Sequence, residues 1–121
     1  MRSIKFRGKR KSDGKWIYGD LLQGPRMSIG HRDDKCGWVY DVDPDTVGQY
    51  TGMKDPQGVE IYEGDILFVT QLGFAEVKYE SGAFIMYGHQ SNACIRLYDQ
   101  NCVNGNIFDN PELLTAEPWK H

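Results

Sequence analysis

Residues 46–66, TVGQYTGMKDPQGVEIYEGDI, decide the fold because they combine β-prone runs with two strong turn signals. The tetrapeptide at 55–58 fits a type I turn, with Asp55 at the first position, Pro56 fixing φ at the second and Gly58 at the fourth. Gly64 allows a sharp bend, and Asp65 can cap the bent backbone before a strand starts at the following isoleucine. We therefore expect these five residues to organise the fold, with no direct role in ligand binding.

Strand signals continue on both sides of this stretch. Residues 4–7 alternate apolar and basic side chains, so Ile4 and Phe6 are expected to point inward. Asp13-Gly14 is a hairpin signal, which predicts a returning strand over 16–22. Residues 23–37 are most simply a loop or a mobile connection between strands. The other predicted strands are 38–40, 46–51, 59–62, 66–71, 74–79, 83–87, 95–98 and 103–108, and residues 110–114 predict one short helical turn.

Composition agrees with an all-β domain of ordinary size. A chain of 121 residues with 40% hydrophobic residues can bury a core, and we expect a single compact unit over residues 1–121. The 14 glycines, scattered among aromatic and β-branched residues, indicate many tight turns. Short strands separated by glycine turns, without a long helical pattern, are typical of a small barrel or sandwich.

Charge is distributed unevenly along the chain. Residues 1–15 contain seven basic side chains and only Asp13 as an acid, a net +6, whereas the remainder holds seven basic and 16 acidic residues, a net −9. Cys36, Cys94 and Cys102 are odd in number and form no Cys-x-x-Cys pair, so we predict neither a disulfide framework nor a zinc site, and no cofactor. Reduced thiols and the lack of a long apolar run predict a cytoplasmic protein that does not insert into membranes.

The stretch at 46–66 also resembles the YopX-like family of small proteins carried by phages and prophages. The segments IKFRGKR at 4–10, GKWIYGDLL at 14–22 and GNIFDNPELL at 105–114 support this resemblance, whereas Met53 and Asn104 depart from it. The resemblance implies a mostly β protein with an N-terminal β-hairpin region at 1–52, an SH3-like barrel at 53–114 and a tail at 115–121. It implies no catalytic residues.

Two functions follow from these observations. The first is a non-enzymatic module that binds a protein partner or itself. The alternative is a nucleic-acid-binding module in which phosphates contact the basic residues Lys5, Arg7, Lys9, Arg10, Lys11 and Lys15 and the aromatic side chains Phe6, Trp16 and Tyr18 stack on bases. Against that alternative, the aromatic residues alternate with polar neighbours in a way that suits core burial.

A small metal-dependent hydrolase is the weakest interpretation. It would use Glu63 and Asp65, or the neighbourhood of His89 and Cys94, but neither group matches a standard metal-site spacing. The acidic run 41–45 lacks the glycine and glutamate that an EF-hand loop requires. The chain also contains no phosphate-binding glycine-rich motif, so nucleotide hydrolysis has no support.

Overall fold

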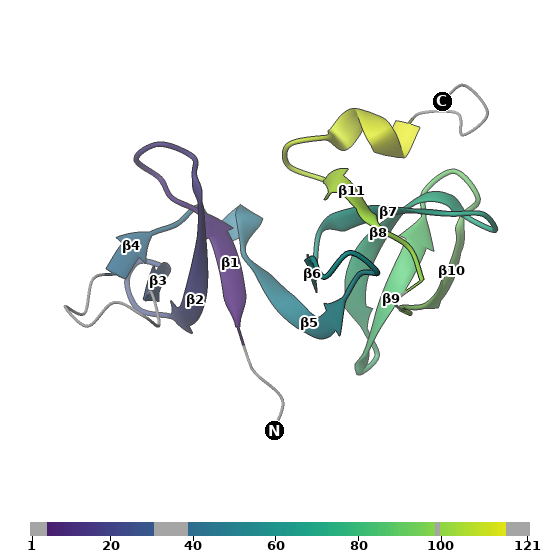
Figure 1. Cartoon of the computed structure of the whole chain (residues 1–121). Coiled ribbons are helices and arrows are strands. Elements are labelled where there is room, and N and C mark those ends of the chain that lie inside the picture. The colour runs from purple at the N-terminus through teal and green to yellow at the C-terminus, as the bar shows by residue number, and fades with distance from the viewer. Residues whose placement is uncertain (1–4, 31–38, 99, 116–121) are drawn as a thin grey trace. The chain divides into compact units, whose positions relative to one another are not determined.

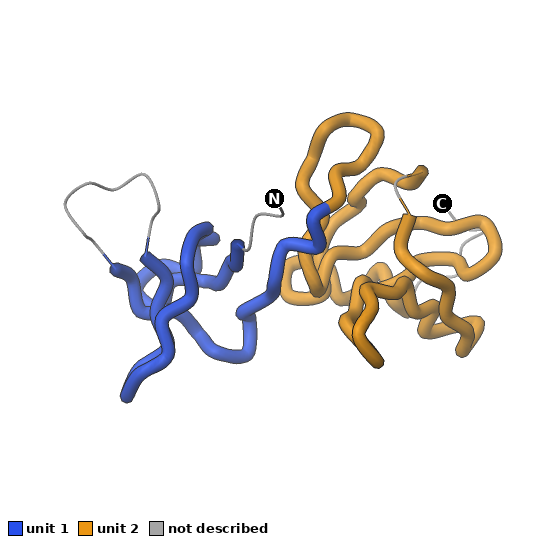
Figure 2. The backbone as a smooth tube through the Cα atoms, turned by 90° about the horizontal axis from the view of Figure 1, so that it is seen from below, with its two compact units in different colours: residues 1–52 blue, residues 53–121 orange. Residues whose placement is uncertain are grey.

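The computed structural model describes residues 5–30, 39–98 and 100–115, in which the protein is mainly β, with two antiparallel sheets (Figure 1). The chain divides into two compact units, Met1–Gly52 and Met53–His121 (Figure 2). The sheets have the strand orders β4-β3-β2-β1-β5-β6 and β10-β9-β8-β7-β11. Strand β5 crosses the boundary between the units. The strands of the first sheet are β1 (Phe6–Lys9), β2 (Trp16–Leu22), β3 (Ser28–Gly30), β4 (Val39–Asp41), β5 (Gly48–Lys54) and β6 (Glu60–Tyr62).

The first unit is built on the predicted hairpin. Strands β1 and β2 pair antiparallel with Arg7 opposite Tyr18 and Lys9 opposite Trp16. At the hairpin end, the Arg10 amide donates to the Lys15 carbonyl at 2.8 Å, and Gly14 has the positive φ of 75° that the Asp-Gly signal predicts.

The core of the first unit lies on one face of this sheet. Ile29 on β3 and Val42 after β4 are fully buried there. Gly8 lies on the same face, where an added Cβ would lie 3.1 Å from Val42 and 3.3 Å from Ile29, a tight contact that would push these side chains away from β1. Phe6, two residues earlier on β1, has the same facing and is half-buried, which agrees with its predicted inward direction. Ile4 lies outside the described residues.

The second unit is an antiparallel sheet around a larger core. Its strands are β7 (Asp65–Val69), β8 (Gly73–Glu80), β9 (Ala83–Gly88), β10 (Ala93–Arg96) and β11 (Val103–Asn106). Alternate side chains point to one face because strands have a period of two. The buried core on that face comprises Ile61, Leu67, Val69, Leu72, Ala75, Val77, Met86 and Leu97.

Three predictions need correction or remain open. Residues 28–30, predicted within a loop, form strand β3, and Thr46, predicted in a strand, ends the 3₁₀ helix η1 (Pro44–Thr46). The C-terminal helical turn is present as the 3₁₀ helix η2 (Pro111–Thr115). In the described residues the strands form open sheets and no closed barrel, so the SH3-like barrel is not confirmed.

Across the described ranges, the structure has no helix with the length and apolar character needed to cross a lipid bilayer.

Candidate functional site

The predicted basic residues lie on and around the β1–β2 hairpin, but they do not share one environment. Arg7 and Lys9 lie on one face of β1, and Phe6 and Gly8 lie on the other. Arg10, Lys11 and Lys15 belong to the connection to β2, and Lys5 precedes β1. The hairpin therefore presents its cations in several directions.

Arg7 is buried, with only 6% of its surface exposed, although the sequence predicts it as a phosphate contact. Its guanidinium lies 4.5 Å from the centre of the Trp16 ring, and the Lys9 ammonium lies 5.5 Å from the same ring. A cation over an indole face is favourable, and it replaces part of the hydration that burial removes. Arg7 consequently supports the sheet at a depth that a nucleic-acid backbone would not reach.

Arg10 pairs with a carboxylate of its own hairpin. Its Nε donates to Asp13 Oδ1 at 3.0 Å, and its terminal nitrogen makes a closer contact with Asp13 Oδ2. The hydrogen bond from Arg10 and a second from the Lys15 backbone amide lower the pKa of Asp13 well below its ordinary value, and the bond to Asp13 raises the pKa of Arg10. Asp13 therefore offsets one of the cations predicted to bind phosphates.

An acidic segment lies directly beside the hairpin. The Lys11 amide donates to the Asp41 carbonyl at 2.9 Å, and the Asp43 amide donates to the Lys9 carbonyl at 2.9 Å. Asp43 and Asp45 are exposed on the 3₁₀ helix η1, where the Asp43 carboxylate accepts from the Asp45 amide. Carboxylates beside the hairpin repel phosphates and so oppose the attraction of the neighbouring cations. The described part of the hairpin is therefore a surface of mixed charge.

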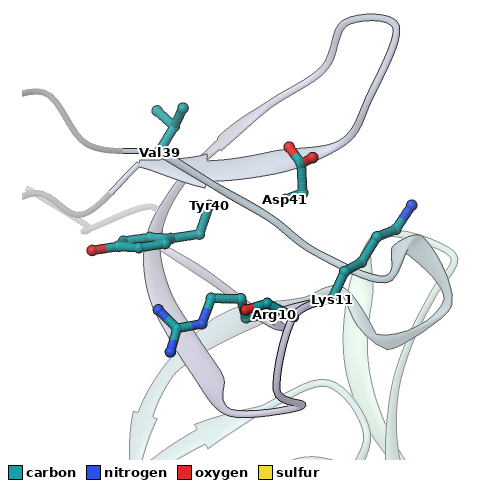
Figure 3. A pocket seen from close by; sticks show the side chains of 6 residues that line it. Arg10, Lys11, Val39, Tyr40 and Asp41 are labelled. Carbon is teal, nitrogen blue, oxygen red and sulfur yellow. The ribbon is translucent and has the colours of Figure 1, made fainter.

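A shallow hollow of about 470 Å³ lies beside the hairpin connection and strand β4. It is lined by Arg10, Lys11, Ser12, Val39, Tyr40 and Asp41. Figure 3 shows Tyr40 and Arg10 extending to the same side, where the guanidinium lies 5.1 Å from the centre of the ring, and Lys11 extending to the other side. The cation that faces this ring is already bound to Asp13, so the hollow is not a strong anion site.

The face of β2, β3 and β4 opposite the core exposes large apolar side chains. We call Trp16, Tyr18, Leu22, Gly30 and Val39 the Tyr18 face, because cross-strand pairing and the two-residue period place them on one face, which also carries exposed Asp20 opposite Gly30. Tyr18 is 42% exposed and Val39 is 49% exposed. Gly30 leaves a depression between Leu22 and Val39, whose side chains lie 3.8 and 3.5 Å from the position of an added Cβ.

Sequence reasoning assigned two of these aromatic residues to the wrong face. The prediction rested on alternation with polar neighbours, but Trp16 and Tyr18 alternate with Ile17 and Gly19, so the pattern fits either register. In the structure the core side of β2 carries Ile17 and Leu21. The pairing of Ile17 with Gly8 on the core side of β1 fixes this register, and it is visible only in the structure.

The residues predicted to organise the fold lie in the second unit, at the turn that begins with Asp55 and at the bend of Gly64 and Asp65. Asp55 is 5% exposed, and its carboxylate accepts from the amides of Gln57, Val59 and Val103 at 2.9, 2.8 and 3.1 Å. Burial opposes ionisation of Asp55, but these backbone hydrogen bonds outweigh it and lower its pKa. The Gly58 amide closes the turn on the Asp55 carbonyl at 2.9 Å, with Pro56 exposed between them.

The bend at Gly64 is held by backbone and side-chain hydrogen bonds. Gly64 has φ 90°, its amide donates to the Val77 carbonyl, and its carbonyl accepts from the Ile107 amide, both at 2.9 Å. Asp65 is 2% exposed and accepts from the Tyr62 amide at 2.8 Å. Both residues therefore make hydrogen bonds that hold this bend in place.

The residues named for a hydrolase do not form one site. His89 lies beside Glu76, with 2.8 Å between Nε2 and Oε1, and Cys94 lies exposed on β10. Within the residues that the structure describes, no three His, Cys, Asp or Glu side chains are grouped closely enough to bind a metal. Cys36, His31 and His121 lie outside the described residues.

The described chain is therefore a small antiparallel β protein with two buried carboxylates that accept from backbone amides, and with the partly apolar Tyr18 face. The family model described as YopX protein matches residues 5–115, so the chain belongs to the YopX family. No curated protein matches the chain. The crystal structure of protein EF1440 from Enterococcus faecalis is similar, with a TM-score of 0.56 and 24% identity over 94% of this chain and 99% of that one. At this identity the likeness shows the fold alone.

Proposed function

We propose that the protein is a non-enzymatic protein-interaction module, and that its first unit binds a partner protein through the Tyr18 face. The supporting observation is that Tyr18, Leu22 and Val39, all exposed by more than two-fifths, share one face of a sheet. Protein interfaces are enriched in aromatic side chains and arginine at their centres. The stacking of Arg7 on Trp16 fixes one edge of this face, which reduces the entropy lost on binding.

This proposal is tested by comparing two serine substitutions of equal exposure. Leu22 on the Tyr18 face is 46% exposed, and Val59 in the second unit is 47% exposed. Partners captured from a lysate of the source cells are identified by mass spectrometry and then titrated against each purified variant. We expect Leu22→Ser to weaken binding about tenfold, as for a central interface residue, and Val59→Ser to leave it unchanged. Equal binding by both variants would remove the Tyr18 face from the proposal.

Nucleic-acid binding by the hairpin remains the alternative function, since Lys9, Lys11 and Lys15 are at least partly exposed. We expect no measurable binding to a DNA or RNA oligonucleotide at about 50 mM salt, because the neighbouring carboxylates offset the hairpin cations. Fluorescence anisotropy at several salt concentrations checks this. If binding occurs and the Lys9→Gln, Arg10→Gln, Lys11→Gln variant flattens the log–log salt slope by about 0.7 to 0.9 per residue, the alternative is correct.

The proposal includes a cytoplasmic setting and the phage or prophage origin that the sequence resemblance implies. Cys94 and Cys102 are free thiols in the structure, which suits a reducing compartment.

A further inference from the structure

The outer edge of strand β10 is less protected than the other strand edges. At β4, the Lys11 amide already occupies the Asp41 carbonyl. At β6, Ile61 and Tyr62 are buried, and at β11 the pairing register shifts between Val103 and Gly105. Strand β10 instead pairs regularly with β9 over all four residues, and among the described strands none pairs with its other edge. Strand β10 therefore lacks the register shift that interrupts β11, and its protection consists of its short length and the charged Arg96.

The backbone groups on this edge can be assigned from the antiparallel ladder. The Leu97 amide donates to the Phe84 carbonyl on β9 at 3.0 Å. Because residues along an antiparallel strand alternate in direction, Ile95 also faces β9, whereas Cys94 and Arg96 direct their N–H and C=O groups outward. The edge therefore presents two donors and two acceptors in a short, extended segment.

We propose that β10 pairs with β10 of a second copy of this chain, in an antiparallel arrangement with a two-fold axis at Ile95. In this register Cys94 of one copy lies opposite Arg96 of the other, and the two pairs use all of the outward N–H and C=O groups. If the two-fold axis passed through Cys94, Arg96 of one copy would instead lie opposite Asn92 of the other. Asn92 has a φ of 54° and lies outside β10. The Ile95 register makes the larger number of hydrogen bonds.

Side chains on both faces suit this register. Glu76, Tyr87 and Cys94 form one cross-strand row on the face opposite the core, and the second copy's Arg96 would extend that row. An arginine beside this row can approach the Tyr87 ring, which also has the Lys78 ammonium 5.2 Å from its centre, whereas the Glu76 carboxylate is bound to His89. On the core side, half-buried Ile95 meets its symmetry mate in a non-hydrogen-bonded pair, where side chains lie closest.

Opposite charges at one exposed position provide the test. Cys94→Glu places a carboxylate opposite the second copy's Arg96, and Cys94→Lys places an ammonium there. Sedimentation velocity of the full chain, up to about 1 mM, should show weak dimers because the edge is short. We expect Cys94→Glu to tighten dimerisation about threefold and Cys94→Lys to weaken it by a similar factor. Adding Arg96→Glu to Cys94→Lys should restore the dimer.

The register is checked by a cysteine at the proposed axis. Ile95→Cys in a Cys94→Ser background should form an intermolecular disulfide on mild oxidation. The native Cys94 thiols of the two copies should not pair, because each lies opposite Arg96 of the other copy. A monomer for both the native chain and Cys94→Glu, or equal effects of Cys94→Glu and Cys94→Lys, would overturn the proposal. The edge lies in the second unit, so neither result depends on the Tyr18 face.

Discussion

Replacing Asp55 with alanine is expected to lower the free energy of unfolding by about 3 kcal/mol, because it leaves three backbone amides without their acceptor. The amides belong to Gln57 and Val59 in the turn and to Val103 at the start of β11. Chemical denaturation monitored by tryptophan fluorescence measures the loss. Asp45→Ala is the control, since this aspartate is exposed on the 3₁₀ helix η1 and its loss should cost no more than about 0.5 kcal/mol.

The same carboxylate should make stability depend on pH in a defined direction. The pKa of Asp55 is lower in the folded chain than in the unfolded chain, so the unfolded state binds more protons between the two values. Its contribution is complete above the unfolded pKa of about 4 and is lost as pH falls through the lower folded pKa. Asp55→Asn should flatten this part of the stability curve. An unchanged curve would show that Asp55 does not set the acid limit.

Replacing Gly64 with valine is expected to lower the free energy of unfolding by about 2 to 3 kcal/mol. A β-branched residue is strongly disfavoured at φ 90°, and Gly64 is buried between the Val77 carbonyl and the Ile107 amide. The melting temperature measured by circular dichroism should fall accordingly.

Two controls separate backbone strain from other effects at this bend. Gly24→Val adds the same side chain at an exposed position without positive φ, where an added Cβ would lie no closer than 3.9 Å to a neighbouring atom, and should be nearly neutral. Glu63→Gln should also leave folding nearly unchanged. If Gly64→Val melts normally while Glu63→Gln abolishes a measured activity, the carboxylates belong to a functional site.

Local chemistry in the sequence was sufficient to predict the turns and most strands. Asp13-Gly14 and the 55–58 turn depend on residues whose backbone preferences are strong and independent of context. Strand β3 could not be predicted, because β-prone Ile29 stands alone between Ser28 and Gly30 and the strand forms by pairing with β2 and β4. The difference between the two cases is whether the determining interaction is local.

The facing of β1 and β2 shows the limit of periodicity. Alternation identified these strands and placed Arg7 on the face opposite the core, but it missed the burial of Arg7 there and placed aromatic Trp16 and Tyr18 inside. The buried guanidinium is stabilised by the Trp16 ring, a partner nine positions away in the sequence. Tertiary contacts of this kind determine both the Tyr18 face and the loss of a continuous basic surface, so the candidate site could not be located without the structure.

The hydrogen bond from Val103 to Asp55 also has a kinetic consequence. It joins residues 48 positions apart, so the turn at 55–58 can form early, but its carboxylate gains this last donor only when β11 docks. Amide exchange should reveal this order, because local opening of β11 would expose the Val103 amide while leaving the Val59 amide protected by its shorter loop. Protection of the Val103 amide by Asp55 would then report on the docking of β11 against the turn.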